Sequence, residues 1–129
     1  MIRVMWRVET TEDFDAWFKS LSETEQEEIY AVIGLLKVMG PQLKRPHADT
    51  LGGSIYANVK ELRANTAGAA LRMAFAFDPL RTAILLTGGD KSGVSQRRFY
   101  KQLIAKADKL YGLHLEKINR RMKEKGKGK

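Results

Sequence analysis

The sequence predicts an α+β domain in which a helical hairpin and a C-terminal helix pack against one mostly antiparallel sheet. Three observations lead to this prediction. Two helical patterns within residues 10–40 are joined by a very short link, three apolar strands lie between residues 55 and 88, and a third helical pattern starts near Ser95. Strands with such short links must run antiparallel. Helices segregated from such a sheet define the α+β class.

An N-terminal strand is expected ahead of the hairpin. The strand spans Arg3–Glu9, and its Val4, Trp6 and Val8 alternate onto one face. A helix start follows at Thr10–Asp13, because hydroxyl side chains cap free amide groups and acidic side chains suit the positive end of a helix. The predicted order of elements therefore begins strand, then helix.

The two helices of the hairpin each carry an apolar stripe at the i, i+3, i+4, i+7 spacing of a buried helix face. The second helix opens with the capping box Ser22–Glu25 and ends at Gly40–Pro41. The stripe residues are Phe14, Trp17, Phe18 and Leu21 in the first helix and Ile29, Val32, Ile33 and Leu36 in the second. We assign these side chains to the core.

A polar loop over 41–54 leads into the meander, whose strands are expected near 55–64, 69–77 and 82–88. Asp78–Arg81 has the composition of a tight turn. The last helix is expected to reach the 110s, with an inner face made of Phe99, Leu103, Ala107 and Leu110. Residues 1–115 are thus predicted to form one domain. The basic segment 116–129 has nothing to bury and is predicted to be a frayed tail.

Charge is distributed unevenly along the chain. The net charge of +8 divides into −4 over residues 1–40, +7 over 41–115 and +5 over 116–129. Such a basic stretch favours a nucleic acid or an acidic protein as partner. The alternative is a surface of solvated lysines with no partner.

Several classes of protein are disfavoured by the sequence. There is no cysteine, so neither a disulfide framework nor a thiolate metal site is expected. No apolar run approaches the ~20 residues that span a bilayer, and charges interrupt the segment where a signal peptide needs its apolar core. His47 and His114 lie apart, without a cluster of ligands. We therefore expect a cytoplasmic protein without a metal, a cofactor or a membrane partner.

Four stretches together resemble the RelE/ParE toxin superfamily, and more closely its HigB branch of phage-derived, toxin-like proteins from type II toxin–antitoxin pairs. These stretches are Arg45–Asp49, Lys60–Arg63, Leu71–Pro79, and Gly89–Lys91 followed by Phe99–Tyr100. The resemblance implies a metal-independent mRNA endonuclease that acts on the ribosome, and an adjacent antitoxin with a helix-turn-helix domain. Alternatives on the same fold are a non-nucleolytic toxin, such as a DNA gyrase inhibitor, and a degenerate RNA-binding module.

Candidate catalytic cations lie on the predicted strands. Cutting RNA without a metal uses the 2′-hydroxyl as nucleophile, and fixed cations stabilise the charge that grows on the phosphate. Arg72 lies in an apolar strand and must reach water or an anion, and its planar fork matches phosphate. Arg63 shares a strand face with Glu61 by period-two alternation. The alternative for both arginines is a structural ion pair with Glu61.

Lys91 and Tyr100 complete the candidate catalytic set. Lys91 lies in a glycine-rich corner that leaves backbone amides available for phosphate. Tyr100 matches the phenol of the RNA-cutting relatives; to act as a base it would need cationic neighbours that lower its pKa from ~10. Helix packing is the alternative role for Tyr100. RNA-cutting relatives often carry lysines at the positions of Val59 and Glu61; this sequence lacks those lysines, so the general base is left unidentified.

Further cations are expected to attract the RNA backbone without reading its bases. The predicted RNA-binding residues are Lys44, Arg45, His47, Arg81, Arg97, Arg98 and Lys101. The pKa of His47, ordinarily ~6.5, also suits acid–base work, although a histidine in such a loop can be a simple turn residue. The lysines of the tail either contact ribosomal RNA or act as solvated spacers.

Overall fold

A five-stranded sheet lies at the centre of the computed structural model, which describes residues 5–127. Its strands are β1 (Arg7–Thr10), β2 (Ala48–Thr50), β3 (Val59–Asn65), β4 (Ala70–Phe77) and β5 (Thr82–Asp90). The spatial order is β1-β5-β4-β3-β2. β1 runs parallel to β5, and the other pairs are antiparallel. The predicted α+β architecture and its antiparallel meander are confirmed.

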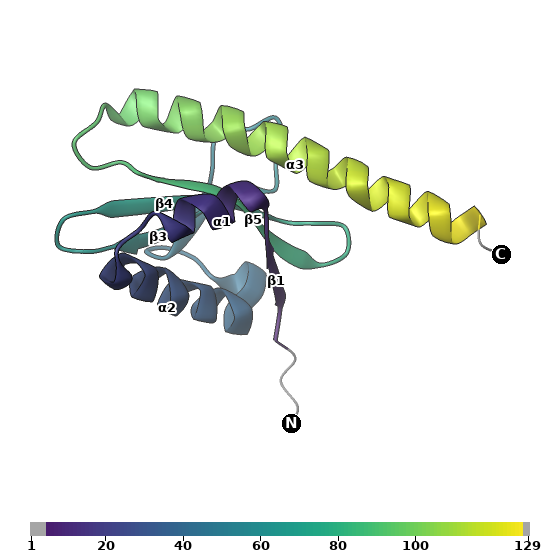
Figure 1. Cartoon of the computed structure of the whole chain (residues 1–129), viewed down its shortest axis with the longest axis horizontal. Helices are drawn as coiled ribbons and strands as arrows, with labels where there is room; N and C mark the ends of the chain where they lie inside the picture. Colours follow the sequence, from purple (N-terminus) through teal and green to yellow (C-terminus); the bar gives the residue numbers. More distant parts are fainter. Residues whose placement is uncertain (1–4, 128–129) are drawn as a thin grey trace.

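Helices cover both faces of the sheet (Figure 1). The three α-helices are α1 (Glu12–Lys19), α2 (Glu23–Met39) and α3 (Gln96–Lys127), and a short 3-10 turn, Gly40–Gln42, follows α2. Strand alternation sends Leu62 and Met73 to the hairpin side, while Val59 and Ala74 face α3. The sheet therefore has two cores, one under the hairpin and one under α3.

The helix boundaries are set by side chains that the sequence identified. The hydroxyl of Thr11 accepts a hydrogen bond from Phe14 N at 3.0 Å, which caps α1. Ser22 and Glu25 form the reciprocal capping box of α2, at 3.2 and 2.9 Å. Gly40 ends α2 with a φ of 55°, a conformation that favours glycine. The predicted hairpin is confirmed at both ends.

Three strand boundaries differ from the prediction. β2 lies inside the predicted loop, because a three-residue strand carries too short a pattern to be seen in a sequence. β3 begins at Val59, since the preceding loop is held to α3 by a hydrogen bond from Ile55 N to Asp108 at 3.1 Å. β1 begins at Arg7; the predicted strand positions Arg3 and Val4 lie outside the described residues.

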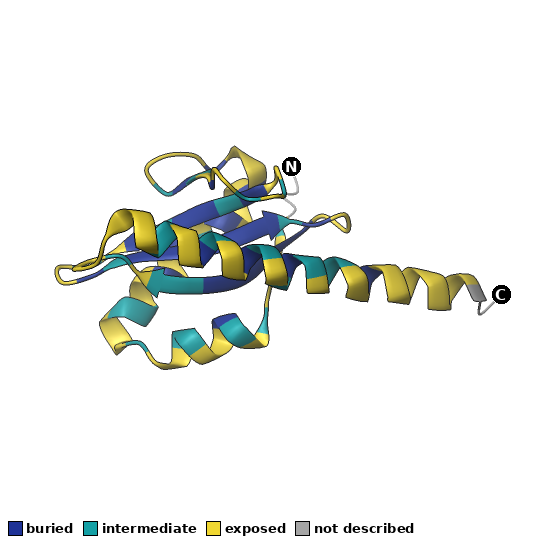
Figure 2. Cartoon of the chain, turned by 90° about the horizontal axis from the view of Figure 1, so that it is seen from above, coloured by how far each residue is buried: buried dark blue, intermediate teal, exposed yellow. Residues whose placement is uncertain are grey.

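The largest departure concerns α3, which continues to Lys127 instead of ending in the 110s. The frayed tail predicted from residue 116 is therefore wrong over 116–127. Ile118 is buried, and His114 contacts the buried Asp78 at 2.8 Å, so the helix stays attached past the predicted end. Beyond that point Lys, Arg, Glu and Met residues are strong helix formers. In Figure 2 this half of α3 is largely exposed and extends past the strands. None of the described helices is apolar over a length that would cross a membrane.

Two glycines provide a matched test of the packing. A Cβ at Gly88 would lie 2.3 Å from the ring of Trp17, whereas nothing lies within 4 Å of a Cβ at Gly34 in α2. Gly88→Ala should lower the free energy of unfolding by about 1–3 kcal/mol through overpacking. Gly34→Ala should raise it by about 0.5–1 kcal/mol because alanine favours the helix. Urea unfolding of both variants measures the difference, and equal effects would contradict the close approach of Trp17.

Candidate functional site

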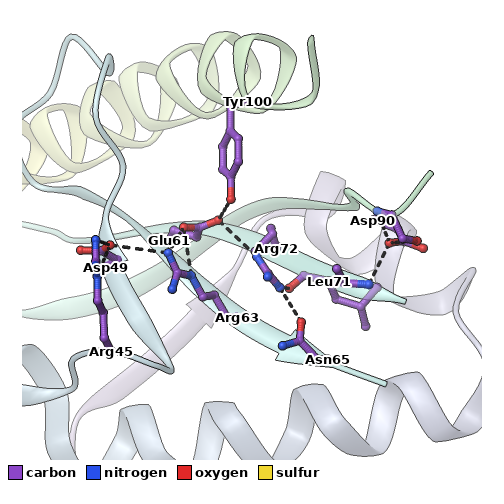
Figure 3. A network of polar contacts seen from close by, with 11 residues as sticks. Arg45, Asp49, Glu61, Arg63, Asn65, Leu71, Arg72, Asp90 and Tyr100 are labelled. Carbon is purple, nitrogen blue, oxygen red and sulfur yellow. Dashed lines mark hydrogen bonds and ion pairs between the residues drawn. The ribbon is translucent and has the colours of Figure 1, made fainter. Parts of the chain in front are cut away.

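Charged side chains of β3 and β4 meet beneath the first turn of α3 (Figure 3). Glu61 and Arg63 alternate onto the α3 side of β3, and Arg72 lies on the same side of β4. The register places Arg63 directly opposite Arg72. Like charges directly opposite each other destabilise a sheet. The arrangement therefore needs a compensating anion.

Glu61 supplies that anion. Its side chain is only 4% exposed, and its Oε2 lies 3.2 Å from Nη2 and 3.3 Å from Nε of Arg63. Its other oxygen, Oε1, lies 3.5 Å from Nε of Arg72 and accepts a hydrogen bond from the hydroxyl of Tyr100. One buried carboxylate thus joins two strands and α3.

The guanidinium of Arg72 has hydrogen-bond acceptors for Nη1 but none for Nε among the described residues. Nη1 donates to Oδ1 of Asn65 at 2.7 Å and to the carbonyl of Leu71 at 2.9 Å. Nε is buried and has no hydrogen-bond partner among the described residues, since its approach to Glu61 at 3.5 Å is an ion pair without hydrogen-bond geometry. Buried donors of this kind are normally satisfied. The guanidinium is therefore held in place with donor capacity left over.

The first turn of α3 comes close because Gly89 lies opposite Arg72. A Cβ at Gly89 would lie 3.0 Å from the ring of Phe99, so the absence of a side chain at this position lets the helix approach closely. Nζ of Lys91 lies 6.0 Å from the centre of the Tyr100 ring, within cation–π range. The end of β5 thus places Lys91 beside the ring of Tyr100.

Burial, followed by the hydrogen bond to Glu61 and its charge, raises the pKa of Tyr100 above 10.0; Arg72 opposes this shift. The phenol therefore keeps its proton. The condition set for its action as a base, a lowered pKa, is not met at this site. The physical reasons are burial of the phenol and, after it, its hydrogen bond to the carboxylate of Glu61, a residue missing from the set chosen from the sequence.

A line of alternating charges continues the cluster toward the edge of the sheet. Oδ2 of Asp49 on β2 lies 3.5 Å from Nη2 of Arg63 and 2.7 Å from Nη2 of Arg45. The hydrogen bond from Arg45, together with one from Thr50, lowers the pKa of Asp49. Successive ion pairs thus connect five side chains into one network: Arg45, Asp49, Arg63, Glu61 and Arg72.

Asp90, beside Lys91, organises the corner. Its Oδ1 accepts hydrogen bonds from Ala70 N at 3.0 Å, Ser92 N at 2.9 Å and the Ser92 hydroxyl at 2.7 Å. Burial opposes ionisation of Asp90, but the Ser92 and Ala70 hydrogen bonds and the Arg72 charge outweigh it and lower its pKa. The carboxylate of Asp90 therefore stabilises the loop after β5 through these hydrogen bonds.

The structure brings together all four predicted catalytic residues, Arg63, Arg72, Lys91 and Tyr100. It also contains both ion pairs that were their structural alternatives, Glu61 with Arg63 and Glu61 with Arg72. Sequence reasoning did not choose Glu61 or Asn65 as site residues. The strand alternation already placed Glu61 beside Arg63, and the missing information was the register that sets Arg72 opposite them.

The predicted RNA-binding residues fall into two groups. Arg45, Arg97, Arg98 and Lys101 lie on the network or on the first turns of α3 and are exposed, as is Lys44 in the adjoining loop. The backbone carbonyl of His47 accepts a hydrogen bond from Arg63 N at 2.8 Å. Arg81 does not join them: it occupies the turn at the other end of β4, with its guanidinium 5.2 Å from the centre of the Trp6 ring. The turn after β4 necessarily lies a strand length from Arg72.

Comparison with known proteins gives consistent matches. The family described as "Phage derived protein Gp49-like (DUF891)" matches residues 16–112. "Putative toxin HigB3" of Mycobacterium tuberculosis (strain ATCC 25618 / H37Rv) is 44% identical over 94 residues, which cover 73% of this chain and 80% of HigB3. "Putative toxin HigB2" of the same strain is 38% identical over 121 residues and 89% of this chain. The match to HigB2 spans 60% of that protein's own length.

Two solved structures share the fold. A mutant of the E. coli toxin RelE in the free state has a TM-score of 0.57 at 10% sequence identity, covering 79% of this chain and 96% of RelE. The archaeal RelE–RelB complex from Pyrococcus horikoshii OT3 gives 0.52 at 12% identity, covering 69% of this chain and 98% of the matched one. At such low identities the likeness establishes the RelE-like fold alone.

The pKa of the Tyr100 phenol is a measurable test of its burial and of its contact with Glu61. Its pKa should lie above 10.0 in the folded protein, and Glu61→Gln should lower it by removing a negative charge. Because an unfolded tyrosine ionises near ~10, the stability contributed by Tyr100 is present below that pH and is lost as the pH rises beyond it. NMR titration of 13C-labelled tyrosine, assigned with Tyr100→Phe, measures the shift. A Tyr100 pKa of 10 or below in the wild type would contradict the contact with Glu61.

Proposed function

This chain belongs to the Gp49-like family of phage-derived proteins, and from that membership we propose that it is the toxin of a toxin–antitoxin pair that cleaves mRNA on the ribosome. The relatives named HigB2 and HigB3 are described as toxins, and the solved RelE structures share its fold. The observation that carries the proposal is the buried Glu61 carboxylate, placed between two arginines and the Tyr100 phenol. This set contains a proton acceptor, fixed cations and a proton donor.

Glu61 acts as the general base in the proposed reaction. One of its oxygens takes the proton of the RNA 2′-hydroxyl as the 2′-oxygen forms a bond to the adjacent phosphorus. In the uncomplexed protein the Tyr100 hydroxyl occupies Oε1. The 2′-hydroxyl must therefore replace Tyr100 at that oxygen, and the phenol is displaced toward the leaving group.

Tyr100 then acts as the general acid. As the bond from phosphorus to the 5′-oxygen breaks, the phenol gives its proton to that oxygen. The products are a 2′,3′-cyclic phosphate and a 5′-hydroxyl end. A pKa raised by burial and by Glu61 keeps the phenol protonated before the reaction, as a donor requires.

Arg72, Arg63 and Lys91 stabilise the charge on the phosphate oxygens as the new bond forms. Arg72 is oriented by Asn65 and by the carbonyl of Leu71, so little reorganisation is needed when charge develops. Because three cations supply this stabilisation, the proposed mechanism uses no metal ion and no cofactor.

The proposal includes the partners of such a toxin. We expect a cognate antitoxin encoded in an adjacent gene, with a helix-turn-helix domain, and action in the cytoplasm where ribosomes translate the mRNA. The fold neighbour from Pyrococcus horikoshii is a complex of RelE with RelB, which supports a protein partner for this fold. Co-purification with the neighbouring gene product tests this part of the proposal.

Arg72→Ala tests the nuclease activity most directly. Removing a preorganised donor of this kind typically slows a reaction on the order of 100- to 1000-fold. Primer-extension mapping of mRNA, together with growth after induction, should show cleavage and arrest for the wild type and their loss for Arg72→Ala. Arg81→Ala, an equal change at the other end of β4, should retain both. Growth arrest with intact mRNA would overturn the proposal, and an accompanying DNA-damage response would indicate a gyrase inhibitor.

Tyr100→Phe separates chemistry from packing. The variant keeps the aromatic ring and removes only the proton donor, so the fold should remain while cleavage slows about 100-fold or more. Single-turnover cleavage of ribosome-bound mRNA at saturating enzyme measures the chemical step. Unchanged cleavage by Tyr100→Phe would exclude the phenol as the acid.

A further inference from the structure

Two carboxylates lie directly opposite each other at one edge of the sheet. The register of β2 and β3 pairs Asp49 with Glu61, so both side chains are on the same face. Directly opposite residues of such a pair have Cβ atoms ~4.5–5.5 Å apart, and like charges in these positions destabilise a sheet. Glu61 has a role in the proposed reaction, whereas Asp49 has none so far.

Arg63 lies between the two carboxylates. Its Nη2 is 3.2 Å from Oε2 of Glu61 and 3.5 Å from Oδ2 of Asp49. A single nitrogen of the guanidinium therefore faces both anions, and the charge of Arg63 is divided between them. If Asp49 carried no charge, Arg63 would pair with Glu61 alone.

Asp49 is held in place from its other side. Its Oδ2 accepts a hydrogen bond from Nε of Arg45 at 2.7 Å, and its Oδ1 accepts one from the backbone N of Thr50 at 2.9 Å. The hydrogen bond from Arg45, followed by the one from Thr50, lowers the pKa of Asp49, so this carboxylate is ionised at neutral pH. The Arg45 side chain is 76% exposed. Water and salt therefore screen the charge of Arg45 more than they screen charges inside the cluster.

Four strands and helices contribute charged or titratable groups around Glu61. Two arginines favour the ionised carboxylate and so weaken it as a proton acceptor. An anion opposite Glu61 has the reverse effect, because two carboxylates that share a site resist being ionised together. The groups that face Glu61 are Arg63 on β3, Arg72 on β4, Tyr100 on α3 with Lys91 beside its ring, and Asp49 on β2.

The strength of Glu61 as a proton acceptor matters for the proposed reaction. A general base is most effective when its affinity for a proton matches the pH at which it works. A carboxylate paired with two arginines and no second anion would hold a proton too weakly. Acid–base sites commonly use two carboxylates whose surroundings differ, so that one stays ionised while the other exchanges a proton.

Building on the proposed function, we propose that Asp49 is a positioning residue for RNA cleavage, which draws Arg63 away from Glu61 and sets a negative charge opposite it, and so strengthens Glu61 as the base. Asp49 acts through Arg63 and Glu61 and does not contact the reacting atoms. Arg45 and Thr50 contribute by fixing the carboxylate of Asp49 at the edge of the sheet. The ion pairs of this edge then serve the reaction as well as the fold.

Asp49→Asn tests the proposal, because asparagine keeps an oxygen that can accept the Thr50 hydrogen bond and removes the charge. The control is Glu27→Gln, which changes the net charge equally at an exposed position of α2. A third variant, Asp49→Glu, keeps the charge. Far-UV circular dichroism and thermal unfolding verify that all three variants are folded.

Titration of the Glu61 carboxylate by 13C NMR, assigned with Glu61→Gln, measures the effect of Asp49 without any RNA. We expect the titration midpoint of Glu61 to fall by about 0.5–1 pH unit in Asp49→Asn. It should stay within about 0.3 unit of the wild type in Glu27→Gln and in Asp49→Glu. An unchanged midpoint in Asp49→Asn, or an equal shift in Glu27→Gln, would overturn the proposal.

Single-turnover cleavage of ribosome-bound mRNA, measured against pH and enzyme concentration, separates the base from RNA binding. In Asp49→Asn the maximal rate should fall about two- to fivefold, and the loss of rate on the acid side should move to lower pH. Binding should stay equal or tighten, because the variant removes a negative charge near the phosphate. A loss of activity caused by weaker binding alone would overturn the proposal. A wild type that does not cleave, with the midpoint of Glu61 shifted as expected, would overturn the proposed function while the effect of Asp49 on Glu61 stands.

Discussion

The organisation of this protein depends on one interaction, the buried carboxylate of Glu61 between Arg63 and Arg72. The antiparallel register of β3 and β4 sets two arginines opposite each other on an enclosed face, and without an intervening anion that register would be opposed by charge repulsion. Glu61 neutralises the pair and then reaches the hydroxyl of Tyr100. The position of α3 over the sheet, and through it the composition of the proposed active site, follows from this contact, from the apolar core beneath α3 and from the space left by Gly89.

Most of the fold could be predicted from the sequence because its signals are local. The capping residues Thr11 and Ser22 act within three residues of themselves, and the apolar stripes of the hairpin repeat within two turns. The length of α3 was not predicted, since its distal half depends on helix propensity and on single anchors such as Ile118 rather than on a repeating apolar face. β2 was missed because a three-residue strand has no periodicity to detect.

The sequence predicted individual residues of the candidate site but not the contacts that join them. Arg72 and Tyr100 could be chosen by their chemistry and by family resemblance, and the structure places them beside the same carboxylate. The role of Glu61 was hidden because a glutamate beside an arginine on a strand is an ordinary surface pair until the neighbouring strand and α3 bury it. Burial and register are tertiary properties, and they also move the pKa of Tyr100 in the direction opposite to the one that action as a base requires. Arg81 was chosen from the sequence because its residue type fits RNA binding, but its position in the turn after β4 keeps it away from the cluster.

β1 joins the sheet through the pairing that spans the longest stretch of sequence. The meander from β3 to β5 forms through neighbouring strands, whereas the parallel β1 pairs with β5 and the adjoining Thr11 hydroxyl reaches Leu86 across 75 residues of sequence. Closing so long a loop carries an entropy cost before any contact repays it. During synthesis, β1 therefore cannot pair until β5, the last strand of the described sheet, has been made. Because Tyr100 follows β5 in the chain, the phenol reaches Glu61 only after all five strands have been made, so the proposed active site is absent from the nascent chain until the start of α3 has been translated.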